Sequence, residues 1–199
     1  GPNPAPFTVV LPTGNWYLAR VHASTPVPGD GTPQRLALRT PPDNPASCWT
    51  YFYVSLLHSG DVPKLAVQVT DPAGNSTGWV TVGKKDGLYG GSALVAELLY
   101  AVPTGGRRDE IALWIAPTVA PDATTAVARS GRWTIDLTNT GDPCLVEGGV
   151  RRADAPSGHP AFGRQARFDD PAYVIYDLAG RAVEEDNRSW IKRLGTISG

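Results

Sequence analysis

Only three side chains in this sequence can exchange a proton near neutral pH, and these are His22, His58 and His159. None of them belongs to an HExxH or HxH pattern, and no GxSxG nucleophile motif occurs. The glycine-rich run at 83–91 lacks the Gly-Lys-Ser/Thr of a phosphate loop and is interpreted as an exposed hairpin or loop. Each histidine is therefore interpreted as structural or superficial, and we expect no catalytic site within this chain alone.

The acidic residues Asp169, Asp170 and Asp177 carry the hard oxygen ligands that calcium prefers. They lack the fixed spacing of an EF-hand, so roles in turns or on a solvated face explain them better. Calcium binding by these three residues stays an alternative, and no other cofactor is expected.

Cys48 and Cys144 are the two cysteines, 96 positions apart. A disulfide between them would close a loop of about a hundred residues and stabilise the fold by ~4–5 kcal/mol in the chain-entropy model. Two buried free thiols are equally consistent with the sequence, because cysteine is often buried as a small hydrophobe. Neither has a CxxC neighbour or a nearby histidine, which argues against a metal site.

Six tryptophans raise the possibility of an aromatic surface that binds sugar. Trp49, Trp114 and Trp133 fall within expected strands, as does Trp16, and core packing is the simpler expectation there. The aromatic residues expected at the surface, where they could form a binding site, are Trp79, Tyr89 and Trp190.

Composition narrows the classes of partner. Apolar residues make up 41% of the chain, and the net charge of −1 argues against nucleic acid or an anionic membrane. No apolar run approaches the ~20 residues that span a bilayer. The chain has no methionine and opens Gly1-Pro2, so we interpret residues 1–6 as a tag scar and linker on an excised or processed product.

Short β-type runs separated by turn signals continue through the first 150 residues, with 22 glycines and 19 prolines in the chain. Residues 49–57 are so rich in aromatic and β-branched side chains that we expect a strand buried on both faces. Residues 92–102 could form a helix by propensity, but their alternation favours a strand. The sequence predicts an all-β jelly roll or β-sandwich of about eight or nine strands. The expected strands are 7–11, 16–22, 35–38, 49–57, 64–70, 78–82, 92–102, 110–115 and 133–137.

Two parts of the sequence resemble known proteins. The segment GRWTIDLTN at 131–139 resembles a strand of the jelly-roll domains attached to subtilisin-like proteases, including the P-domains of proprotein convertases. A tract of three segments is similar to one in large bacterial subtilisin-like (S8) serine proteases. The segments are VRRAD at 150–154, GRQARFDDPAY at 163–173 and RLGTIS at 193–198. In that group a β-sandwich is inserted within the catalytic domain. The resemblance covers residues 131–199.

The resemblance implies an accessory domain of a serine endopeptidase, inserted before the nucleophile motif G-T-S-(M/V)-A-A-P. That motif and the Asp and His segments of a triad do not occur here, and Ser198 is not followed by Ala-Ala-Pro. The implied organisation is a β-sandwich at 7–150 and an extended arm at 151–199 that packs on the catalytic domain of the same polypeptide.

The implied role is to control access of protein substrate or to place the protease on its target. Such proteases are often exported, which favours a secreted or periplasmic location. The alternative is an autonomous carbohydrate- or protein-binding module, with no membrane span and no nucleic-acid partner.

Overall fold

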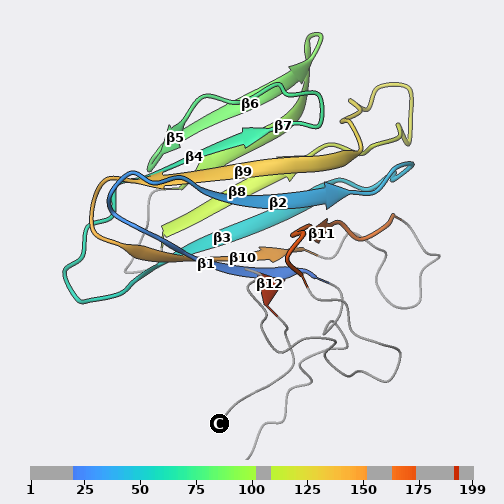
Figure 1. The fold of residues 1–199 in the computed structure, drawn as a ribbon. Coiled ribbons are helices and arrows are strands. Elements are labelled where there is room, and N and C mark those ends of the chain that lie inside the picture. The colour runs from blue at the N-terminus through green and yellow to red at the C-terminus, as the bar shows by residue number, and fades with distance from the viewer. Residues whose placement is uncertain (1–19, 102–108, 152–162, 174–190, 193–199) are drawn as a thin grey trace, which may run out of the picture.

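A computed structural model describes residues 20–101, 109–151, 163–173 and 191–192. The described residues form two antiparallel sheets packed face to face, as Figure 1 shows. All assigned elements are strands, so the predicted all-β sandwich is confirmed. No helix long and apolar enough to cross a membrane occurs in this part of the chain.

The larger sheet has seven strands in the order β12-β1-β10-β3-β8-β7-β6, and every neighbouring pair is antiparallel. Its strands are β1 (His22–Val27), β3 (Cys48–Leu56), β6 (Lys84–Gly90), β7 (Ala93–Tyr100), β8 (Asp109–Ile115), β10 (Cys144–Val150) and β12 (Ile191–Lys192).

The smaller sheet has five strands in the order β11-β2-β9-β4-β5, again antiparallel throughout. Its strands are β2 (Gln34–Thr40), β4 (Leu65–Thr70), β5 (Val80–Thr81), β9 (Gly131–Asn139) and β11 (Arg167–Phe168).

The connections follow the jelly-roll pattern. Strands β1, β2, β3 and β4 alternate between the two sheets, and β8, β9 and β10 alternate in the same way on the return. The returning strands pair with the outgoing ones, so that β10 lies between β1 and β3 while β9 lies between β2 and β4. This topology brings residues far apart in sequence into register on one sheet.

Alternate side chains of both sheets point inward and form one apolar core. Trp133 is completely buried, as expected from sequence, and its indole Nε1 donates a hydrogen bond to the carbonyl of Arg129 at 3.1 Å. The segment 163–173, expected within the arm, packs on the sandwich itself. It adds β11 to the edge of the smaller sheet and buries Phe168 in the core.

Several expected elements differ from the observed ones. Of the two structures expected for the glycine-rich run at 83–91, the hairpin is observed, because residues 84–90 form the mostly exposed strand β6 and pair with β7. The predicted strand at 92–102 is confirmed as β7. Strand β10 was missed, since Glu147-Gly148-Gly149 looks like a turn in sequence. The expected strand at 7–11 and most of that at 16–22 lie outside the described residues.

Gly148 fits tightly at the centre of the core. A Cβ at this position would lie 2.5 Å from Cδ1 of Phe52 and 3.2 Å from Cζ of Phe168. The two rings lie 6.2 Å apart and are tilted by 58°. The missing side chain therefore allows one aromatic pair to join β3, β10 and β11.

Replacing this glycine tests the close packing. We expect Gly148→Ala to lower the free energy of unfolding by about 1–3 kcal/mol, because the ring of Phe52 must move. Gly149→Ala is the matched control, since a Cβ on Gly149 would meet no atom within 4 Å. Urea unfolding of both variants measures the difference. An equal loss of stability in the two would contradict the packing argument.

Candidate functional site

The acidic residues proposed for calcium have other partners. The carboxylate of Asp169 accepts hydrogen bonds from Arg39 at 2.6 and 3.0 Å and lies 3.8 Å from Nε of Arg132. Asp170 accepts a hydrogen bond from the backbone of Ala172 at 2.9 Å. Asp177 lies outside the described residues. Within the described ranges, no three His, Cys, Asp or Glu side chains gather closely enough to hold a metal ion. Calcium binding stays a prediction without structural support.

The disulfide alternative for Cys48 and Cys144 is corrected by the structure. Both are free and buried. Cys144 stands opposite Leu56 in the pairing of β10 with β3, whereas Cys48 begins β3 eight residues earlier. At about 3.3 Å per residue the two cysteines are about 26 Å apart, far beyond the ~7 Å between Cα atoms that a disulfide tolerates.

Burial makes both thiols unreactive. Burial raises the pKa of Cys48 to about 12, although a contact with the Thr50 hydroxyl at 3.8 Å opposes the shift. Burial, and then the charge of Asp109, raises the pKa of Cys144 to about 11. The same two causes raise the pKa of Tyr100, whose hydroxyl donates to Asp109 at 2.9 Å. Thiolates are the nucleophilic form, so neither cysteine is a candidate nucleophile.

The aromatic residues expected at the surface belong to different elements. Trp79 is 48% exposed and directly precedes β5 of the smaller sheet. Tyr89 is 65% exposed and lies on β6, the edge of the larger sheet. Trp190 lies outside the described residues. Both described residues are exposed as predicted, but no contact joins them into one site.

An aromatic surface that the sequence analysis missed covers the outer side of the larger sheet. Along β3, Trp49, Tyr51 and Tyr53 point outward while Cys48, Thr50 and Phe52 point into the core. We call the outward set, together with Trp114 of β8, the aromatic face. Trp49 is 37% and Tyr53 41% exposed, which corrects the expectations of a strand buried on both sides and of Trp49 in the core.

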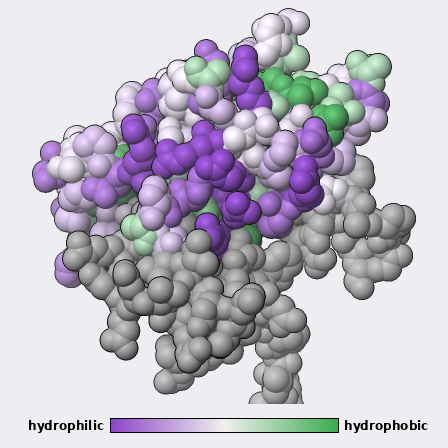
Figure 2. Space-filling view, turned by 45° about the vertical axis from the view of Figure 1, so that its right-hand side comes forward, coloured by the Kyte–Doolittle hydropathy of each residue, from purple (hydrophilic) through white to green (hydrophobic). Residues whose placement is uncertain are grey.

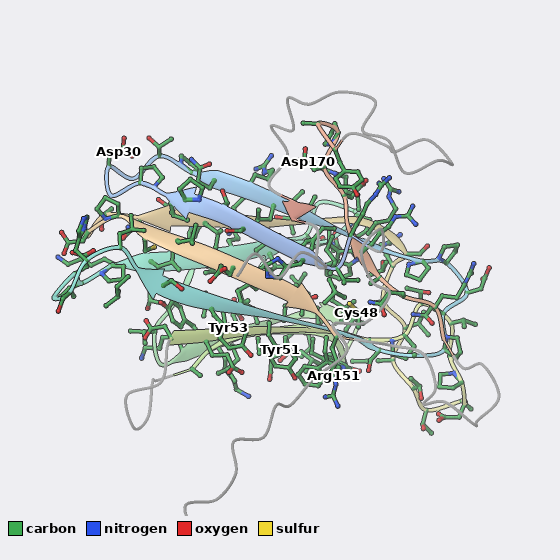
Figure 3. All side chains as sticks on the ribbon, turned by 90° about the horizontal axis from the view of Figure 1, so that it is seen from below. Asp30, Cys48, Tyr51, Tyr53, Arg151 and Asp170 are labelled. Atoms are coloured by element: carbon green, nitrogen blue, oxygen red, sulfur yellow. The ribbon has the colours of Figure 1, made fainter. Side chains whose placement is uncertain are left out.

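The rings of the aromatic face contact one another. Trp49 and Tyr51 are parallel within 8°, with centroids 6.0 Å apart. Trp49 and Trp114 stand opposite each other in register and are tilted by 54° at 6.5 Å. Figure 3 shows Tyr53, Tyr51 and Arg151 following one another in a line. The pairing of β10, β3 and β8 therefore holds the aromatic face in a fixed arrangement.

Charged residues border the aromatic face. Tyr53 stands between Glu147 of β10 and Glu110 of β8 in the sheet register. The hydroxyl of Ser55 donates to Glu147 at 3.3 Å. At the other end, the backbone N–H of Arg151 donates to the carbonyl of Trp49 at 2.8 Å. The face thus offers acceptors at one end and a guanidinium at the other.

The opposite sheet has a polar exterior. Arg35 donates two hydrogen bonds to the carboxylate of Asp136 at 2.6 and 3.0 Å, and this partner raises the pKa of the arginine. Near the end of β2, a hollow of about 400 Å³ is lined by Arg39, Arg164 and Arg167 among others. Arg39 binds Asp169, and Arg164 donates to the carbonyl of Pro42. Figure 2 shows hydrophilic side chains in a broad band across one face of the molecule.

The sandwich has a counterpart among solved structures. It is similar to the CspB protease of Clostridium perfringens, with a TM-score of 0.55 and 15% sequence identity over 80% of this chain. The match covers 29% of that protease, so this chain spans less than a third of its length. No protein-family profile and no curated protein matches the chain. The shared fold is therefore one that also occurs as part of a protease.

The buried thiols predict slow chemical labelling. A thiol reagent such as dithionitrobenzoate should leave both cysteines unmodified in the native protein and modify both after denaturation in urea. Adding a reducing agent should not change the melting temperature, because no disulfide is present. Loss of stability on reduction would contradict the structure.

The raised pKa values also predict a loss of stability in alkali. Above about pH 9 the unfolded chain releases thiol protons that the folded chain keeps until its higher pKa values are reached. The contribution of the two buried thiols to the free energy of unfolding should therefore be fully present below pH 9. It should be lost progressively as the pH rises toward 11. The variant Cys48→Ala/Cys144→Ala should lose less unfolding free energy between pH 9 and pH 11, as measured by urea unfolding at each pH. An equal loss in the variant would assign the pH dependence to other groups.

Proposed function

We propose that this chain is a non-catalytic accessory domain of a subtilisin-like serine endopeptidase, inserted within the catalytic domain and controlling access of protein substrates. Support comes from the tract at 150–198 that resembles such proteases and from the fold shared with part of a Clostridium protease. The sequence carries no triad motif, which fits a role beside the catalytic centre.

One structural observation carries the inserted arrangement. Strand β12 pairs with β1, so that His22 stands opposite Lys192 at the edge of the larger sheet. Neighbouring strands lie about 5 Å apart, and a domain inserted into another needs its first and last segments side by side. The sandwich meets this requirement, because nearly its whole sequence lies between two adjacent strands.

The same corner contains a second connection. The guanidinium of Arg20, just before β1, lies 4.4 Å from the ring centroid of Tyr173. The N–H of Phe168 donates to the carbonyl of Arg20 at 2.7 Å. These contacts tie Arg20, just before β1, to β11 and the segment after it. A tie of this kind would help to hold the sandwich at a fixed position relative to a catalytic domain.

The test uses the longer polypeptide that carries this chain. Residues 22–192 are replaced by a short Gly/Ser linker, which the adjacency of His22 and Lys192 permits without stretching the junction. Cleavage of a short chromogenic peptide should stay within about threefold, while cleavage of a folded protein substrate should change by about tenfold or more. Both rates are compared with those of the intact polypeptide.

Two outcomes overturn the proposal separately. Equal changes on the peptide and the protein substrate would refute control of substrate access. If the intact polypeptide shows no cleavage that a serine-directed inhibitor blocks, the assignment to a serine protease is refuted. A variant of the intact polypeptide with its nucleophilic serine replaced by alanine is the matched control for contaminating activity.

A further inference from the structure

We propose that the aromatic face binds a neutral polysaccharide, with pyranose rings stacked on the aromatic side chains of β3 and hydroxyl groups bound by the charged border. This proposal goes beyond the accessory role and does not depend on it, because the site lies entirely within the described sandwich.

The spacing of the rings suits a chain of sugar units. Alternate residues along a strand are about 6.8 Å apart, so Trp49, Tyr51 and Tyr53 form a straight row of three. A pyranose ring exposes C–H groups on its faces, and these groups pack against the electron-rich face of an aromatic ring. The rings of Trp49 and Tyr51 are nearly parallel and stacked on each other, so they form a rigid aromatic pair that a ligand can cover from outside.

Small residues keep the middle of the row accessible. Tyr51 stands in register between Gly149 of β10 and Ala112 of β8. A Cβ on Gly149 would meet no atom within 4 Å, so the space on that flank is open. The two smallest side chains thus flank the central ring, and a ligand can approach it from both neighbouring strands.

The border chemistry favours a neutral, hydroxyl-bearing ligand. Sugar hydroxyls both donate and accept hydrogen bonds, and the carboxylates of Glu147 and Glu110 accept while the guanidinium of Arg151 donates. The carboxylate of Glu110, opposite Tyr53, opposes an anionic polysaccharide at that end of the face. Nearby, Nζ of Lys85 lies 3.0 Å from a carboxylate oxygen of Glu97, so these two charges cancel. Aromatic stacking in the centre with mixed hydrogen-bonding groups at both ends matches the two kinds of surface on a sugar ring.

The site is rigid before any ligand binds. Strands β3 and β8 are both flanked by hydrogen-bonded neighbours, so the backbone beneath the rings is fixed by the sheet. Leaving large aromatic rings partly exposed costs about 25 cal/mol for each Å² of apolar surface in water. A preformed, partly exposed aromatic row gains this free energy when a ligand covers it, with little ordering cost.

Binding is tested on the 199-residue chain by calorimetry and tryptophan emission. The probes are cellohexaose, mannohexaose and chitohexaose, with polygalacturonate and a lysine-rich peptide for comparison. We expect binding to at least one neutral oligosaccharide, and Tyr51→Ala should weaken it by about tenfold. Trp79→Ala and Tyr89→Ala are matched controls, since they remove exposed aromatic rings outside the aromatic face, and should leave the affinity unchanged.

A second variant covers the case in which Tyr51→Ala fails to fold. Ala112→Arg places a long side chain beside Tyr51 and should block binding while circular dichroism stays unchanged. The proposal is overturned if no neutral oligosaccharide binds at about 1 mM, or if Trp79→Ala abolishes binding while Tyr51→Ala does not. Preferential binding of polygalacturonate or of the peptide would overturn it too. In the longer polypeptide, protection of the aromatic face from acrylamide quenching would assign it to a domain contact instead.

Discussion

The packing of Phe52 into the space left by Gly148 is the constraint on which much of this sandwich depends. The ring reaches across the backbone of β10 and meets Phe168 of β11, so one contact joins the larger sheet, the smaller sheet and the last part of the chain. Strand β11 pairs with β2 over only two residues. Such a short pairing contributes little by itself, and the buried ring of Phe168 supplies the apolar contact that holds it.

The same constraint determines the outer surface. Side chains alternate along a strand, so placing Phe52 inward forces Tyr51 and Tyr53 outward, and placing Gly148 inward forces Gly149 outward beside Tyr51. A shift of the register by one residue would bring the outer aromatic rings into the core and expose Phe52. Core packing therefore fixes the positions of the aromatic face, and Trp114 of the face also packs against the core cluster.

The link between core packing and the outer surface also explains which features could be predicted from the sequence. Fold class and most strands followed from periodicity and turn residues, because these depend on local pattern. Strand β10 did not, since the need for Gly148 is apparent only against Phe52, a contact across nearly a hundred positions. The run from Trp49 to Tyr53 is apolar on both sides, so periodicity could not reveal its exposed side. The alternation of Glu110, Ala112 and Trp114 on β8 was the available signal.

The position of the aromatic face relative to β12 and β1 bears on the accessory role that we propose. Strands β12 and β1, where the chain enters and leaves the sandwich, belong to the same sheet as the face, and only β10 separates β1 from β3. Two strand spacings amount to about 10 Å. A polymer bound along β3 would therefore lie close to whatever domain is attached at that edge. Because a β-sheet with a packed core bends little, binding at the face would fix the distance between the polymer and the attached domain, which is what placing an enzyme on its target requires.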